Sequence, residues 1–138
     1  MKVSLNLAQE YSNVDLLSIG TDTILHKIGS QLGAVEEVID WGSRFNGIVV
    51  AKIVSCEKHP NADKLSICLI DDGGVNKDVT RTSDNLVQVV CGAPNVRKGL
   101  LVAWLPPGST VPKSLEKDPF VLGSRELRGV VSNGMLAS

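Results

Sequence analysis

A chain of 138 residues has room for one domain and a small additional segment, and its 43% hydrophobic content is normal for a globular protein. A net charge of −1 excludes a uniformly basic nucleic-acid-binding domain, so any contact with RNA must depend on a few placed cations. The sequence has no apolar run of the roughly 18 residues that a membrane span needs and no secretory signal at its start. We therefore expect a cytoplasmic protein without membrane contact.

Residues 1–44 are expected to form a short α+β segment that is acidic, with three Lys/Arg against six Asp/Glu. Apolar residues recur with helical spacing between residues 24 and 32, and Gly33 follows them as a helix-ending residue. The expected elements are a strand at Lys2–Asn6, a helical turn at Leu7–Tyr11, a helix that starts at a Thr21 or Asp22 cap, and a strand at Val35–Ile39. Trp41-Gly42-Ser43 marks the boundary to the next module.

Residues 45–138 contain five apolar runs with strand character, separated by Pro-, Gly- and Asn-containing turns. Such a series of short strands without a long helix indicates a mainly β domain that closes into a small barrel. A five-stranded OB-fold is the expected version, while an SH3-like barrel or a sandwich fragment fits the same pattern. The expected strands are Ile48–Cys56, Leu65–Ile70, Val87–Cys91, Leu100–Leu105 and Phe120–Leu127, the last broken by Gly123.

The sequence offers no convincing catalytic or cofactor-binding set. It lacks a G-x-S-x-G motif and a phosphate-binding loop, and Asp71-Asp72 beside two glycines is expected to be a solvated turn. Three widely spaced cysteines without a C-x-x-C pair favour small apolar strand residues over a metal site or a disulfide. We therefore expect no catalytic residue, no metal and no cofactor in these 138 residues.

Cations near the turns are the better candidates for function, because basic side chains at the rim of an OB barrel can neutralise RNA phosphates. Each cation alone is more easily explained as a solvated charge, and His59 before a proline is expected to pack at the rim. Ser132 and Asn133 could bond RNA or form a bulge that closes the barrel. The candidate RNA-binding residues are Lys58, His59, Lys64, Arg97, Lys98, Arg125, Arg128, Ser132 and Asn133.

Aromatic residues are scarce, at 4% of the chain, so base stacking cannot dominate RNA binding. Contacts to backbone phosphates and to RNA shape remain. They predict modest affinity, low sequence discrimination and a steep dependence on salt.

Three motifs occur in a specific order: His59–Leu65 (HPNADKL), Val90–Asn95 (VCGAPN) and Leu127–Met135 (LRGVVSNGM). In this order they resemble the tRNA-binding OB-fold module of several aminoacyl-tRNA synthetases and of stand-alone tRNA-binding proteins. Residues 1–44, with Met1–Leu5, Glu10-Tyr11 and Ala34–Val38, narrow the resemblance to the N-terminal part of the bacterial phenylalanyl-tRNA synthetase β subunit.

That resemblance implies a non-catalytic module that holds tRNA during aminoacylation within a much larger subunit. It implies tRNA-Phe as the RNA, an α subunit as partner in an (αβ)₂ heterotetramer, and ATP and Mg²⁺ as holoenzyme cofactors that bind elsewhere. Residues 1–44 would be half of a small domain that later chain completes, so we expect them to be loosely packed. The Gly73–Leu86 loop is longer than is usual in the family, and Ser124 replaces a commonly basic residue.

Two other readings stay open. The chain could be a stand-alone tRNA-binding protein or the module of another synthetase, although its N-terminal segment argues against this. It could also be a protein-interaction or dimerisation barrel, in which the motif turns serve folding alone.

Overall fold

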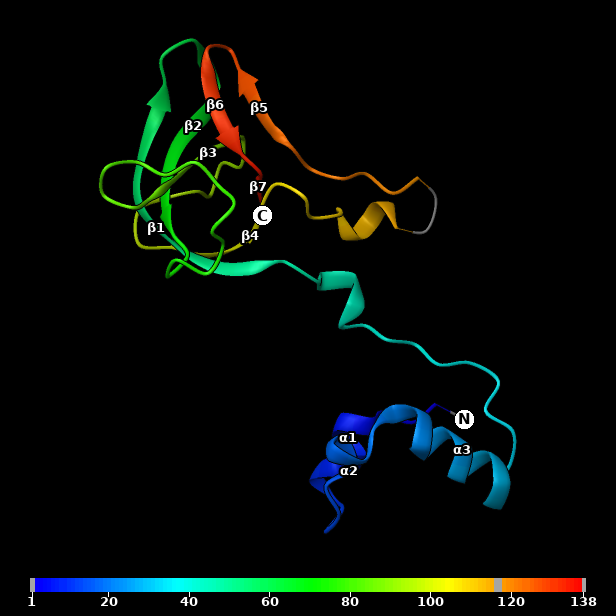
Figure 1. The fold of residues 1–138 in the computed structure, drawn as a ribbon. Helices are drawn as coiled ribbons and strands as arrows, with labels where there is room; N and C mark the ends of the chain where they lie inside the picture. Colours follow the sequence, from blue (N-terminus) through cyan, green and yellow to red (C-terminus); the bar gives the residue numbers. More distant parts are fainter. Residues whose placement is uncertain (1, 116–117, 138) are drawn as a thin grey trace. The chain divides into compact units, whose positions relative to one another are not determined.

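The computed structural model describes residues 2–115 and 118–137. The chain divides into two compact units, Met1–Asp40 and Trp41–Ser138 (Figure 1). Throughout the described part of the chain, no helix is long and apolar enough to cross a membrane.

The first unit consists of three short helices, α1 (Leu5–Glu10), α2 (Leu16–Ile19) and α3 (Thr21–Gln31). The strand expected at residues 2–6 is wrong, because the Ser4 hydroxyl accepts the Leu7 amide hydrogen and starts α1 there. The strand expected at 35–39 is also absent from the described residues, so the unit is helical rather than α+β. Helix α3 is confirmed, although Gly20 occupies its N-cap position instead of Thr21 or Asp22.

Packing in this unit is sparse. None of the three helices contains a buried residue, and apolar side chains such as Leu17 and Leu32 are largely exposed. Hydrophobic burial therefore contributes little to the stability of these helices in the chain as it stands.

The second unit is mainly β, as predicted, and is consistent with an OB-like fold (Figure 1). The strands are β1 (Val49–His59), β2 (Ala62–Asp71), β3 (Val87–Cys91), β4 (Leu101–Leu105), β5 (Ser124–Leu127), β6 (Val130–Asn133) and β7 (Met135–Ala137). The larger sheet is antiparallel with the order β3-β2-β1-β4-β7, and a two-stranded sheet pairs β5 with β6. A short 3₁₀ turn at Ser43–Phe45 precedes β1, and another at Pro112–Ser114 follows β4.

The fifth strand of the large sheet is β7 and not the 120–127 segment that the sequence suggested. Strand β5 occupies only the end of that segment and pairs with β6. Strands β6 and β7 are separated by Gly134 alone, and β7 pairs with β4. On the opposite side, β6 lies beside β3, where the Val90 amide donates to the Ser132 hydroxyl at 2.9 Å. The β6–β7 segment thus links the two edges of the sheet and closes the barrel.

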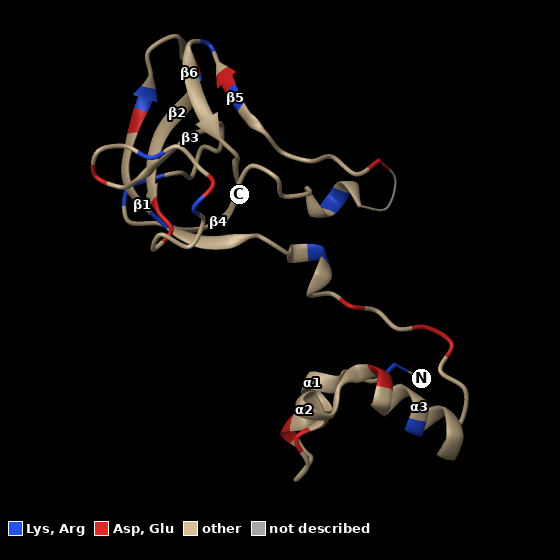
Figure 2. Cartoon of the chain, viewed as in Figure 1, with Lys and Arg blue, Asp and Glu red and all other residues tan. Residues whose placement is uncertain are grey.

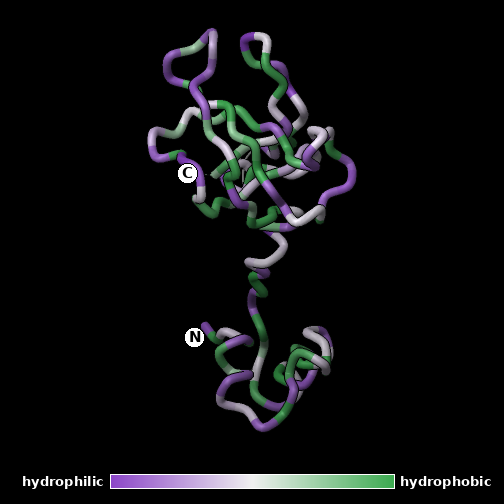
Figure 3. The backbone as a smooth tube through the Cα atoms, turned by 90° about the vertical axis from the view of Figure 1, so that its left-hand side faces the viewer, coloured by the Kyte–Doolittle hydropathy of each residue, from purple (hydrophilic) through white to green (hydrophobic). Residues whose placement is uncertain are grey.

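The barrel core is built from aliphatic residues, two cysteines and one tryptophan, and Figure 3 shows hydrophobic segments along the barrel strands. An irregularity between Ile53 and Ser55 shifts the alternation of β1, so that Ile53 and Cys56 both pack toward the core. Burial, together with the neighbouring Cys56, raises the pKa of the Cys68 thiol to about 12. This agrees with the expected role of Cys68 as a small apolar strand residue.

Candidate nucleic-acid interface

The first motif forms the tight turn between β1 and β2, which both extend further than the sequence indicated. His59 ends β1 and is only 4% exposed. Its Nδ1 accepts the backbone N–H of Asn61 at 3.0 Å, which places the ring proton on Nε2. Nε2 therefore donates to the carbonyl of Leu127, 3.0 Å away and 68 residues later. The histidine packs at the rim, as expected, and it also connects two turns.

The third motif forms the turn between β5 and β6. Arg128 and Gly129 both have positive φ, at 51° and 89°, which is the signature of a two-residue type I′ hairpin turn. The Asn61 side chain donates from Nδ2 to the Arg128 carbonyl at 3.2 Å. Residues 59 and 61 of one motif therefore hold residues 127 and 128 of the other, and the two turns lie side by side.

We call this pair of turns the hairpin end. Its three exposed cations are Lys58, Lys64 and Arg128. Lys58 pairs with Ser66, which lies two residues after Lys64 on β2, and the pairing shifts between Lys58 and His59. The two lysines therefore lie near the turn, one on each strand of the β1–β2 hairpin. Their acidic neighbours Glu57 and Asp63 are exposed as well. Figure 2 shows basic segments at the ends of both hairpins.

Arg125 belongs to the same hairpin but is set back from its tip. It pairs with Ser132 in the middle of the β5–β6 ladder, and its guanidinium carbon lies 5.3 Å from the centre of the Phe120 ring. This cation–π contact directs Arg125 away from the turn, along the segment that leads into β5. The side chain remains exposed, so it flanks the hairpin end without being part of it.

Arg97 and Lys98 lie in the loop between β3 and β4, beside the middle of β1. The Val96 carbonyl accepts a weak bond from Cys56 Sγ, and the Gly99 amide donates to the Ile53 carbonyl at 2.7 Å. Cys56 lies two residues before Lys58 along β1, and Ile53 lies five residues before it. At the usual rise per strand residue, these separations along the strand are roughly 7 and 16 Å. The structure therefore divides the candidate cations into a hairpin end and a separate loop pair.

Ser132 and Asn133 are buried, each only 3% exposed, and their polar atoms are used within the barrel. The Asn133 side chain donates to the Gln88 carbonyl and accepts from the Ser124 hydroxyl, while its carbonyl accepts the indole N–H of Trp104. The Ser132 hydroxyl accepts the Val90 amide hydrogen on β3 and donates to the Gly134 carbonyl. These contacts favour the barrel-closing alternative over direct contact with RNA.

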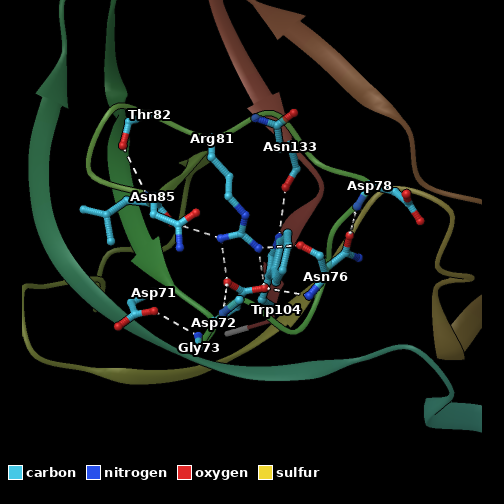
Figure 4. Close-up of polar contacts among 12 residues, drawn as sticks. Asp71, Asp72, Gly73, Asn76, Asp78, Arg81, Thr82, Asn85, Trp104 and Asn133 are labelled. Carbon is cyan, nitrogen blue, oxygen red and sulfur yellow. Dashed lines mark hydrogen bonds and ion pairs between the residues drawn. The ribbon is translucent and has the colours of Figure 1, made fainter.

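The long β2–β3 loop contains an ion pair that the sequence reading missed (Figure 4). Asp71 caps the Gly73 amide as an exposed turn residue, as expected. The Asp72 side chain is fully buried and binds Arg81 through two contacts, at 2.8 and 3.0 Å, so the solvated turn predicted for it is wrong. Arg81 also donates to the carbonyls of Asn76 and Asn85. The signal in the sequence was an arginine within the polar loop nine residues after Asp72.

The ion pair changes the acidity of Asp72. Hydrogen bonds from Arg81, together with the Asn76 and Gly74 amides, lower the pKa of this carboxyl to about 2, against the opposing effect of burial. The loop is therefore a fixed structure around a buried carboxylate. In the described residues it brings no further candidate cation to the hairpin end.

Comparison with known proteins places this barrel in a family. The model of the putative tRNA-binding domain matches residues 48–138, which cover all seven strands of the second unit. The chain belongs to the tRNA-binding domain family. The two turns that make the hairpin end are thus parts of a tRNA-binding domain, and the module is one for binding tRNA.

Among its relatives are phenylalanine–tRNA ligase beta subunits of several bacteria. The one from Protochlamydia amoebophila is 38% identical over the whole chain, which covers 15% of that protein. The one from Cupriavidus pinatubonensis is also 38% identical over the whole chain, which covers 16% of it. The one from Nitrobacter winogradskyi is 37% identical over 87% of the chain, which corresponds to 14% of that protein. The chain therefore spans about a seventh of the length of these relatives.

Proposed function

We propose that the hairpin end of this tRNA-binding domain holds the phosphate backbone of tRNA while another part of a larger ligase carries out aminoacylation. One observation carries the proposal: hydrogen bonds from His59 and Asn61 bring the β1–β2 and β5–β6 turns together, and with them Lys58, Lys64 and Arg128. Three exposed cations at one end of the barrel suit contact with phosphates at several positions.

The side chains available at the surface favour shape and phosphate contacts over base recognition. Trp104 is buried in the core, Phe120 already stacks with Arg125, and Trp41 stacks with Arg44 at 4.5 Å. Few aromatic faces remain for base stacking, which is the usual source of binding energy for single-stranded RNA. We infer that the module grips folded tRNA without reading its identity.

The larger protein is part of the same proposal. The relatives support a phenylalanine–tRNA ligase beta subunit. With it we propose a cytoplasmic location, tRNA-Phe as the RNA, and an α subunit as partner in an (αβ)₂ assembly. In the described residues, no group of three or more His, Cys, Asp or Glu side chains could hold a metal ion. We further propose that ATP and Mg²⁺ bind to other parts of the assembly.

A charge-matched comparison tests the proposal. The triple variant Lys58→Ala, Lys64→Ala, Arg128→Ala is expected to weaken binding of a tRNA-Phe transcript at least about tenfold near 0.1 M salt and to lower the slope of log affinity against log salt by about 3. The control Lys27→Ala, Lys77→Ala, Lys113→Ala removes the same charge from exposed positions elsewhere. Fluorescence anisotropy over a range of KCl concentrations measures both quantities.

Equal losses in the two triple variants would mean that only net charge matters and would overturn the assignment of the hairpin end. Unchanged binding in both would favour the interaction-barrel reading instead. The double variant Arg97→Ala, Lys98→Ala shows separately whether the β3–β4 loop takes part.

A further inference from the structure

The contact between the two turns suggests a role for residues that carry no charge. Resting on the proposed function, we infer that Asn61 and His59 are positioning residues: they hold the β5–β6 turn so that Arg128 contributes to the RNA-binding surface. They act through Arg128 and do not touch RNA themselves.

The backbone of Arg128 gives the first reason. Its φ of 51° lies in the left-handed region, which costs a residue other than glycine or asparagine about 1 kcal/mol. Type I′ turns usually place Asn or Asp before Gly, so arginine is an unusual choice there. An unfavourable residue that persists at a turn tip suggests that its side chain serves a purpose other than folding.

The hydrogen bonds give the second reason. The carbonyl of Arg128 itself accepts from Asn61, and the carbonyl before it accepts from His59. Two donors on one rigid hairpin therefore fix the peptide groups on either side of the Arg128 Cα. This fixes the direction of the Arg128 Cα–Cβ bond, so less backbone entropy at the turn is lost when the guanidinium binds a phosphate.

The availability of atoms gives the third reason. His59 is buried and both of its ring nitrogens are bonded within the chain, so it has no group free for RNA. The Asn61 side chain is exposed at the turn, yet its amide group donates to the Arg128 carbonyl. Both residues are therefore placed to set the geometry of Arg128, and the neutral Asn61 amide cannot replace the charge of Arg128.

A double-mutant cycle tests the inference with a tRNA-Phe transcript and the 138-residue chain. Arg128→Ala is expected to weaken binding about threefold to tenfold and to lower the salt slope by about 1. Asn61→Ala should change both quantities in the same direction by a smaller amount. In the Arg128→Ala background, Asn61→Ala should have no further effect, because the residue through which it acts is gone.

Additive effects of the two substitutions, or wild-type affinity and slope for Asn61→Ala alone, would overturn the inference. Asn46→Ala, at an exposed asparagine before β1 and outside the three motifs, is the matched control and should leave both quantities unchanged. His59→Leu is expected to resemble Asn61→Ala, and if it unfolds, the Asn61 cycle still decides. A wild-type chain without salt-dependent binding would instead contradict the proposed function itself.

Discussion

Replacing Gly134 by alanine is expected to lower the free energy of unfolding by about 3 kcal/mol or more, because the new side chain adds both backbone strain and overpacking. Gly134 has a φ of 81°, and a Cβ there would lie 2.0 Å from the carbonyl oxygen of Leu105. The atom that a new Cβ would meet belongs to the backbone of β4, which cannot move without disturbing its pairing with β7. The barrel closes at this point, so the strain would act where the two sheet edges meet.

Gly108→Ala is the matched control, because Gly108 has a φ of 90° but nothing within 4 Å of the position of a new Cβ. This variant should lose only the cost of the left-handed backbone, about 1 kcal/mol. Thermal or denaturant unfolding of both variants measures the difference. Similar losses for the two glycines would show that β4 does not approach Gly134 as closely as the structure has it.

Removing the carboxylate of Asp72 is expected to destabilise the domain almost as strongly. Asp72→Asn leaves the Arg81 guanidinium, whose side chain is only 15% exposed, without its charged partner. Breaking a buried pair from one side costs about 3 kcal/mol, since the remaining charge is left uncompensated. The control Asp71→Asn changes the exposed neighbour, which caps one amide, and should cost about 1 kcal/mol or less.

The same pair determines how stability varies with pH. The pKa of Asp72 is lowered from 3.8 to about 2. The stability that its ionised carboxylate contributes to the folded state is therefore fully present above about pH 4 and is lost as the pH falls toward 2. For a shift of this size the loss is about 2 kcal/mol. Denaturant unfolding between pH 2 and 6 should show a drop in the wild type that is smaller in Asp72→Asn. Equal slopes in the two proteins would contradict the assigned ion pair.

The sequence predicted the strands well where alternation and burial agree. Val87–Cys91 was placed with its observed bounds, and the expected run at 100–105 differs from β4 by one residue. Around the first turn the sequence was misleading, because the expected strands ended at Cys56 and resumed only at Leu65. The His59 ring accepts the Asn61 amide hydrogen and allows a much tighter turn. Such a side-chain contact has no signature in periodicity.

The end of the barrel was harder to predict, because two glycines in LRGVVSNGM allow several backbone paths. Gly129 completes a hairpin turn and Gly134 permits a close crossing over β4, and only the tertiary structure distinguishes these uses. The candidate site was predicted in part for the same reason. Exposure of Lys58, Lys64 and Arg128 follows from their local sequence, but their proximity depends on contacts 67 and 68 residues apart. Burial of Ser132 and Asn133 likewise depends on β3 and β4.

Residue-resolved mapping of the tRNA contact surface tests the central claim most directly. Amide ¹H–¹⁵N spectra of the chain during titration with a tRNA-Phe transcript should show the largest changes at residues 58–64 and 125–130, and small changes in the 73–86 loop. Raising the salt concentration should reverse them, because the contacts are to phosphates. The largest changes in the 73–86 loop or on α1–α3, with residues 58–64 and 125–130 unaffected, would contradict the account.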